Sequence, residues 1–338
     1  MKILVTGGAG YLGSVLSPLL LAEGHTVTVM DNLMHGGRSL LASFGHPNFR
    51  FLPADIRDEA AVASGMTDSD AVVHLAAIVG DPACARDPKL ATETNDRASE
   101  GLINRARAAG VRRFLFASTC SNYGRMADTS VAATEDHDLS PLSLYAETKV
   151  VTEKRLLGRA DASMGGTVLR FATLFGPSPR MRFDLTVNQF VKEALTDRAL
   201  TVFGEQFWRP YVHVRDAARA IATVLNAPAD TVFGQVFNVG HSDENYRKLD
   251  LVSLITQHVP DLKVSYVPVA DDPRDYRVSF ERIRTVLGFE PSTRVPQGVA
   301  QLIQALEAGL FNPLDDPSYS NTYQRPSSAG VQEAACAQ

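Results

Sequence analysis

Hydrophobic positions along the first half of the chain follow two alternating patterns. Short, continuous apolar runs predict buried strands at residues 3–6, 27–31, 49–53, 71–75 and 113–118. Longer segments with apolar residues at helical spacing predict helices between them, among these residues 12–23, 94–109 and 143–157. Apolar strands that alternate with helices are typical of a parallel sheet covered on both faces. The pattern therefore predicts an α/β fold with a Rossmann-type, doubly wound parallel sheet.

The pattern becomes irregular from about residue 171. Pro177, Pro179 and Pro210 interrupt it, and a short strand is predicted at residues 236–239. We expect a first domain at residues 1–170 and a smaller, partly interleaved lobe at residues 171–311, some of whose segments return to the first domain. Residues 312–338 are rich in Pro, Ser, Asp and Ala without periodicity, and predict a docked or mobile tail.

Composition and charge exclude several classes of protein. The chain has 45% hydrophobic and 21% charged residues, and its net charge of −5 argues against nucleic acid or an anionic membrane as a partner. Cys84, Cys120 and Cys336 are too few and too scattered for a disulfide framework or a zinc site, and no metal is expected. No signal peptide precedes the first strand, and no apolar run approaches the ~18–20 residues that span a bilayer. We expect a cytoplasmic protein.

A glycine-rich loop lies between the first predicted strand and the first predicted helix. Gly7, Gly10 and Gly13 are spaced three apart, with Tyr11 and Leu12 between the last two. Glycines allow a sharp turn and let the backbone approach a pyrophosphate, whose charge then lies at the helix N-terminus. The alternative is a glycine-rich turn that binds nothing.

Acidic residues follow the second and third predicted strands. Asp31, before Asn32, can accept hydrogen bonds from the adenosine ribose hydroxyls and would repel a 2′-phosphate. This favours NAD over NADP, although Arg38 nearby leaves NADP open, and Asp31 could instead begin a turn. Asp55, before Ile56, could meet the adenine amino group or cap the following helix.

Tyr145 and Lys149 are four residues apart in a predicted helix and therefore share one face. A nearby ammonium favours the phenolate and lowers the phenol pKa from its usual value of about 10. Such a tyrosine can take a proton from a sugar or alcohol hydroxyl. The spacing alone also arises by chance on helix surfaces.

Together, these motifs resemble the extended short-chain dehydrogenase/reductase family of NAD-dependent nucleotide-sugar epimerases and dehydratases, which includes UDP-glucose 4-epimerase. The resemblance runs from residue 1 to about residue 310. Its landmarks, in the family's order, are residues 7–13, 31–33, Asp55, 74–77, Asn95, 118–119, 123–124, 145–149 and 209–214.

The resemblance implies a role for each matching position. Tyr145 would be the acid/base, Lys149 would hold the nicotinamide ribose, and Thr119 would be the hydroxyl partner for the sugar oxygen, with Ser118 as its neighbouring alternative. Residues 1–170 would be the NAD-binding domain, with NAD held by Gly7, Gly10, Tyr11, Leu12, Gly13, Asp31, Asn32, Asp55, Ile56, Leu75, Ala76, Ala77, Asn95, Ser118, Tyr145 and Lys149. A nucleotide-sugar substrate in the second lobe would meet Thr119, Cys120, Ser121, Thr173, Asn188, Arg209 and Arg274. His74 and His213 lie in apolar runs and are expected to be structural.

Positions 120 and 121 bear on the reaction. Family 4,6-dehydratases carry Asp and Glu there, and decarboxylases keep the Glu, whereas this chain has Cys120 and Ser121. Cys120 precedes Tyr123 by three residues, one more than the cysteine of reductase-epimerases such as GDP-fucose synthase. It is therefore either a displaced acid/base or an inert buried cysteine.

The resemblance then implies an NAD-dependent nucleotide-sugar epimerase, acting at C4 through hydride transfer to NAD, a keto-sugar intermediate and hydride return. The alternatives are an NAD(P)H-dependent nucleotide-sugar 4-ketoreductase or reductase-epimerase, and with less support a dehydratase or a non-catalytic NAD-sensing protein. Thr173 replaces a family Asn, and Arg180 and Arg182 would either be solvated or meet an acidic sugar or a deoxysugar. A homodimer is expected through the helices at residues 94–109 and 143–157.

Overall fold

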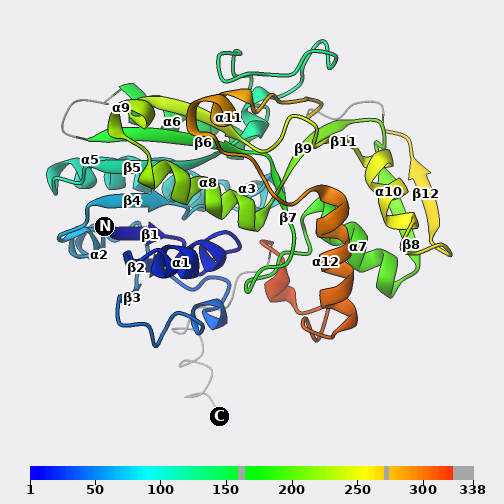
Figure 1. The fold of residues 1–338 in the computed structure, drawn as a ribbon, viewed down its shortest axis with the longest axis horizontal. Helices are drawn as coiled ribbons and strands as arrows, with labels where there is room; N and C mark the ends of the chain where they lie inside the picture. The colour runs from blue at the N-terminus through cyan, green and yellow to red at the C-terminus, as the bar shows by residue number, and fades with distance from the viewer. Residues whose placement is uncertain (159–163, 270–273, 323–338) are drawn as a thin grey trace.

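The computed structural model describes residues 1–158, 164–269 and 274–322, and its largest element is a sheet of seven parallel strands (Figure 1). In spatial order the strands are β10 (Gln235–Val239), β6 (Gly165–Phe171), β5 (Arg113–Thr119), β4 (Ala71–His74), β1 (Lys2–Thr6), β2 (Thr26–Asp31) and β3 (Phe49–Pro53). From β1 the chain adds β2 and β3 on one side and then continues with β4 on the other side. Sheets of this kind bind nucleotides at this switch point between β1 and β4. The predicted α/β class and parallel sheet are confirmed.

Helices cover both faces of the sheet, and alternate residues of each strand point to opposite sides. In β1, Ile3 and Val5 belong to one hydrophobic core and Leu4 to the other. Figure 1 shows α1 (Gly13–Ala22) and α8 (Val214–Asn226) on the first face. The other face is covered by α2 (Glu59–Met66), α5 (Ser99–Ala108) and α6 (Leu144–Gly158).

The second lobe contains two small sheets and their helices. One sheet pairs β9 (Trp208–His213) with β7 (Thr173–Phe175) and β11 (Asn245–Arg247), and the other pairs β8 (Ala199–Phe203) with β12 (Lys263–Val267). The helices of this lobe are α7 (Thr186–Thr196), α10 (Lys248–Thr256) and α12 (Val295–Glu307). Shorter helical segments of the chain are η1 (Arg38–Leu40), α3 (Asp81–Arg86), α4 (Pro88–Thr92), η3 (Cys120–Tyr123), α9 (Ala229–Val232), α11 (Glu281–Leu287) and η4 (Pro317–Tyr319).

Two features of the fold differ from the simplest sequence prediction. The helix predicted at residues 94–109 is divided, because a π-helix, η2 (Glu93–Ala98), precedes α5. The chain also returns to the first layer, where α8 packs on α1 and β10 pairs with β6. The interleaving was expected, whereas the boundary at residue 170 stays a prediction.

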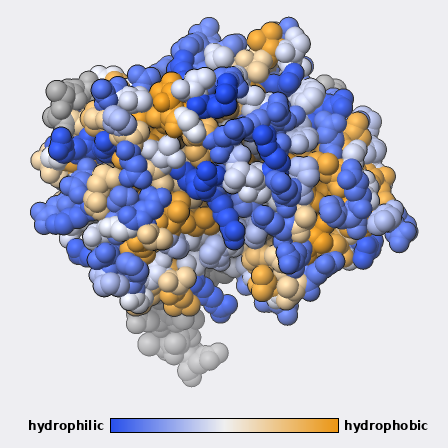
Figure 2. Space-filling model, in the orientation of Figure 1, coloured by the Kyte–Doolittle hydropathy of each residue, from blue (hydrophilic) through white to orange (hydrophobic). Residues whose placement is uncertain are grey.

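The described part of the predicted tail, residues 312–322, lies against the second lobe. The Tyr319 ring packs on Phe183 and Phe311, with ring centroids 5.5 and 6.0 Å apart. Residues 323–338 of that tail, Cys336 among them, lie outside the described residues. Figure 2 shows polar side chains over most of one face, with smaller apolar groups among them. In the described ranges, no helix is long and apolar enough to cross a membrane.

Candidate active site

A cavity of about 550 Å³ lies at the carboxyl ends of the central parallel strands and is shared by both lobes. The predicted site residues in its wall are Gly7, Gly10, Tyr11, Leu12, Gly13, Asp31, Asn32, Asp55, Ile56, Leu75, Ala76, Ala77, Ser118, Thr119, Ser121, Tyr145, Lys149, Thr173, Arg209 and Arg274. The structure therefore brings together residues that are up to 267 positions apart in the sequence (274 − 7).

The glycine loop can adopt its shape only because key positions lack a side chain. Gly7 has φ +74°, and a Cβ there would stand 2.6 Å from the backbone nitrogen of Ala76. A Cβ at Gly13 would stand 2.4 Å from the carbonyl oxygen of Gly7. The loop leads directly into α1, whose N-terminal amides attract an anion. This backbone fits the pyrophosphate of a dinucleotide.

Two carboxylates mark the adenosine end of the cavity. Asp31 is half-buried and accepts hydrogen bonds from the backbone amides of Ala9 (3.0 Å) and Leu33 (2.8 Å), and desolvation raises its pKa. Burial also raises the pKa of Asp55, but hydrogen bonds from Arg57 outweigh it and hold that pKa below its usual value. Helix α2 is capped by a different carboxylate, Asp58, so capping does not occupy Asp55.

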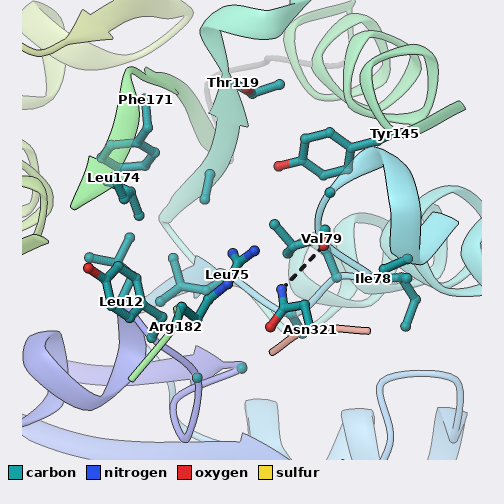
Figure 3. A pocket seen from close by; sticks show the side chains of 18 of the residues that line it. Leu12, Leu75, Ile78, Val79, Thr119, Tyr145, Phe171, Leu174, Arg182 and Asn321 are labelled. Carbon is teal, nitrogen blue, oxygen red and sulfur yellow. Dashed lines mark hydrogen bonds between the residues drawn. The ribbon is translucent and has the colours of Figure 1, made fainter. Parts of the chain in front are cut away.

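Tyr145 lies in the first turn of α6, and Figure 3 shows its hydroxyl pointing into the cavity from the side that Thr119 also borders. Thr119 ends β5, and its Oγ1 accepts a hydrogen bond from the Ser121 amide at 3.1 Å. Lys149 follows Tyr145 by one helical turn, and its Nζ donates to the carbonyl oxygen of Ala117 at 2.8 Å. These three side chains form the predicted catalytic group on one wall.

The electrostatics of this group differ from the sequence prediction. Burial raises the pKa of Tyr145, and the leading opposing charge is that of Arg182 rather than Lys149. Burial also lowers the pKa of Lys149 to about 8. The Lys149 ammonium lies 5.8 Å from the centre of the Tyr145 ring and donates to a backbone carbonyl. The expectation that Lys149 lowers the tyrosine pKa therefore stays a prediction.

A buried ion pair supports the wall from behind. Glu153 of α6 bonds to Arg170 of β6, with Oε2 2.7 Å from Nη2, and both side chains are nearly inaccessible. Glu153 also accepts hydrogen bonds from Ser118 and from Asn122 (2.8 Å). Since Ser118 precedes Thr119, this network fixes the end of β5 where the predicted hydroxyl partner lies.

Three predicted contact residues lie outside the cavity wall. Asn95 is buried. Its side-chain oxygen accepts a hydrogen bond from the Ile78 amide (2.7 Å), and its side-chain nitrogen donates to the Ile78 carbonyl (2.9 Å). Asn95 therefore supports the cavity wall from behind. Cys120 donates to the carbonyl oxygen of Arg170 at 3.2 Å, and burial raises its thiol pKa well above the usual value. This geometry favours the inert cysteine over an acid/base.

Asn188 is the third of these residues. It is fully buried, and it donates to Tyr11 Oη (3.1 Å) and to the carbonyl oxygen of Arg182 (2.8 Å). Its Oδ1 accepts from the Gly176 amide at 2.9 Å. These bonds leave it inside the protein, where it braces the segment that carries Arg182 instead of contacting a diphosphate.

Basic residues of the second lobe border the other end of the cavity. Arg209 is buried, donates to the Trp208 carbonyl at 2.7 Å and lies 5.5 Å from the centre of the Tyr276 ring. Arg274 forms an ion pair of 3.1 Å with Asp81. Guanidinium groups suit a diphosphate because they can bind two of its oxygens at once.

Sequence reasoning left the position of two wall residues open and missed a third. Arg180 and Arg182 are buried there rather than solvated, and Arg182 forms a two-point ion pair with Asp184 at 3.0 and 2.8 Å. In the sequence, the charge of residues 180–184 was the only feature that pointed to Arg180 and Arg182 as site residues. Asn321 also lines the cavity, and nothing in the composition of the tail indicated it.

No group of three or more His, Cys, Asp or Glu side chains among the described residues is placed to hold a metal.

The parallel sheet, the glycine loop and the tyrosine–lysine wall define a Rossmann-type, dinucleotide-dependent enzyme class. Residues 3–240 match the model of the NAD dependent epimerase/dehydratase family. The chain therefore belongs to this family, within the extended short-chain dehydrogenase/reductases, and the prediction of NAD as cofactor is confirmed.

Relatives and solved structures of this kind carry out several reactions. The chain is 31% identical to a UDP-glucose 4-epimerase of Mycolicibacterium smegmatis over 90% of this chain and 98% of that protein. It is 29% identical to UDP-glucuronic acid decarboxylase 1 of Danio rerio over 90% of this chain and 72% of that protein. A dTDP-glucose 4,6-dehydratase from Streptomyces venezuelae, crystallised with NAD, has a TM-score of 0.83 at 28% identity and covers 93% of this chain and 100% of its own.

Proposed function

We propose that the protein is an NAD-dependent nucleotide-sugar epimerase that acts at C4. The observation that carries this proposal is the wall formed by Tyr145, Thr119 and Lys149, in which an acid/base hydroxyl faces the cavity beside a second hydroxyl. This wall offers proton transfer to one sugar oxygen and no further acid or base for a second bond.

The carboxylates of the described cavity wall support the proposal, because each already has a hydrogen-bond or ion-pair partner and is not poised as a base. Asp31 accepts two backbone amides, and Asp55 pairs with Arg57. The other two are Asp81, bound by Ser143 and Arg274, and Asp184, bound by Arg182. Eliminating water across C5 and C6 needs a base poised at C5 and an acid for the leaving hydroxyl. The neutral residues at positions 120 and 121 do not supply them.

In the proposed reaction, Tyr145 takes the proton of the C4 hydroxyl while Thr119 holds the same oxygen by a hydrogen bond. NAD, when bound, supplies the hydride acceptor and a positively charged ring. Because burial raises the Tyr145 pKa, the residue needs positive charge near its oxygen to act as a base at neutral pH. Arg182 provides part of that charge. Tyr145 later returns the proton to the reduced sugar oxygen.

The substrate is proposed to be a nucleotide diphosphate sugar whose diphosphate meets Arg209 and Arg274. The named relatives act on UDP sugars and one solved neighbour on a dTDP sugar. A UDP-glucuronic acid 4-epimerase of Bacillus cereus, which has a TM-score of 0.82 at 25% identity and covers 92% of this chain and 100% of its own, makes acidic sugars part of the set to be tested.

The test is a screen of UDP-glucose, UDP-galactose, UDP-glucuronic acid and dTDP-glucose with NAD, followed by NMR of the products in deuterated water. A C4 epimerase yields the C4 epimer without deuterium in the sugar and without net formation of NADH. Deuterium at C5 with loss of water would instead identify a dehydratase, and release of CO2 from UDP-glucuronic acid a decarboxylase. Either result would overturn the proposal.

The second candidate function is a nucleotide-sugar 4-ketoreductase, because the same three residues can protonate a carbonyl oxygen as NADH delivers its hydride. Stoichiometric oxidation of NADH by a 4-keto sugar nucleotide, without epimerisation of any sugar in the screen, would favour it.

We also propose a homodimer paired through α5 and α6, where Val151 is an exposed apolar residue. Light scattering of Val151→Glu, expected to be monomeric, tests the dimer.

A further inference from the structure

The two lobes are joined at the glycine loop by a compact set of hydrogen bonds. Tyr11 donates through its hydroxyl to the Gly176 carbonyl at 2.5 Å, and its own carbonyl accepts from Ser178 Oγ at 2.7 Å. Ser14 of α1 lies 3.0 Å from Ser178, Oγ to Oγ. The segment that begins at Gly176 is thus fixed directly beside the loop that fits a pyrophosphate.

Arg180 follows Ser178 by two residues and is part of the cavity wall. The side chain is buried, with 6% of its surface exposed. Its Nε and Nη2 groups are the unusual feature, because they have no hydrogen-bond partner among the residues that the structure describes. A buried guanidinium with unused N–H groups is costly unless an anion completes it.

The charges around Arg180 locate it at the cofactor end of the cavity. Burial and the nearby Arg182 lower its pKa to about 10, while Asp184, Asp31 and Tyr11 act in the opposite direction. Asp31 ends β2 and Tyr11 belongs to the glycine loop, so both are cofactor-side groups. Arg209, by contrast, lies against Tyr276 in the second lobe.

We propose that Arg180 is an anion-binding residue of the dinucleotide site, and that its Nε and Nη2 groups bind an oxygen of the NAD pyrophosphate from the side opposite the glycine loop. The second lobe thereby holds the cofactor as well as the substrate. This division assigns Arg180 to the cofactor diphosphate and Arg209 to the substrate diphosphate. It rests on the NAD dependence of the family and not on C4 epimerisation, so a failed epimerase assay would leave it standing.

The test measures binding instead of turnover. Wild type, Arg180→Met, Arg209→Met and the surface control Arg50→Met are titrated with NAD, adenosine and UDP by calorimetry, after any NAD retained through purification has been quantified and removed. Thermal unfolding confirms that each variant is folded, and Arg180→Lys serves as a second variant that keeps the charge without the forked donor.

We expect each of the two arginine variants to weaken the binding of one ligand and to leave the other unchanged. Arg180→Met should weaken NAD binding by about 10- to 100-fold, the range for loss of a charged hydrogen bond, and leave adenosine and UDP within about twofold of wild type. Arg209→Met should weaken UDP and spare NAD, and Arg180→Lys should fall between wild type and Arg180→Met for NAD. Unchanged NAD binding in Arg180→Met would overturn the proposal. So would loss of UDP in that variant, or a wild-type preference for NADP that the variant abolishes, because each assigns the guanidinium to another phosphate.

Discussion

The side-chain amide of Asn321 donates a hydrogen bond to the carbonyl oxygen of Val79 at 3.2 Å, which joins residues 242 positions apart (Figure 3). The backbone amide of Asn321 also donates to Asp184 at 3.1 Å. Val79 follows β4 in the first layer and Asp184 precedes α7 in the second lobe, so one residue bridges the two walls of the cavity.

Removing the Asn321 side chain should weaken substrate binding in the cavity without affecting the catalytic step. Asn321→Ala loses one hydrogen bond worth about 0.5–1.5 kcal/mol, which corresponds to a rise of about two- to tenfold in KM for the nucleotide sugar. The kcat should stay within about twofold, since Tyr145 and Thr119 are untouched. Steady-state kinetics checks this, with Asn226→Ala as a control that loses a surface bond to Glu23. A fall in kcat at constant KM would contradict the bridging role.

Replacing the proposed acid/base should separate chemistry from binding. Tyr145→Phe keeps the half-buried ring in place and removes only the hydroxyl, so turnover should fall by about 10²- to 10⁴-fold. The affinity for NAD, measured by calorimetry, should stay within about twofold of wild type. Tyr266→Phe, at an exposed tyrosine, is the matched control. Turnover that survives in Tyr145→Phe would show that another group moves the proton.

The buried pair behind the wall should be asymmetric in its response to mutation. Glu153→Gln leaves Arg170 charged and without its counter-ion, which should lower the free energy of unfolding by about 3–5 kcal/mol. The double variant Glu153→Met/Arg170→Met should lose less than the single variant, because no isolated charge remains buried. Urea unfolding measures the stability of both variants, with exposed Glu307→Gln as control. A double variant less stable than Glu153→Gln would contradict this expectation.

Local sequence patterns were sufficient for the parts of the site that lie on one element. The glycine loop is recognisable because its backbone excludes side chains at Gly7 and Gly13, and Tyr145–Lys149 because a helix places them one turn apart. Six of the seven strands of the main sheet were predicted from their apolar runs, whereas β6, which begins with two glycines, was not.

Long-range packing decided what the sequence could not reveal. Charge at residues 180–184 is compatible with solvent or with a cavity, and the burial of Arg180 depends on long-range packing such as the bond from Ser178 to Tyr11. The position of the Lys149 ammonium depends on the carbonyl of Ala117, which lies on β5, an element distant in the sequence from α6. Asn321 has no local pattern at all, because its partners come from both lobes.

His74 should make stability depend on pH. It is buried between Thr6 Oγ1 (2.8 Å) and Ser99 Oγ (2.9 Å), and burial, with Lys149, lowers its pKa from 6.5 to about 3. Between these values the unfolded chain binds a proton here that the folded protein does not. Stability is therefore present above pH 6.5 and is lost as pH falls towards 3, at up to about 1.4 kcal/mol per pH unit.

Urea unfolding at several pH values tests this dependence. His74→Asn should be less stable than wild type at pH 7, because it leaves a gap and loses hydrogen bonds, but its stability should fall less steeply as the solution is acidified. The difference between the two proteins therefore narrows below pH 6.5. The same replacement at exposed His46 controls for the loss of a histidine side chain as such. Parallel curves for wild type and His74→Asn would show that His74 does not carry the acid sensitivity of the fold.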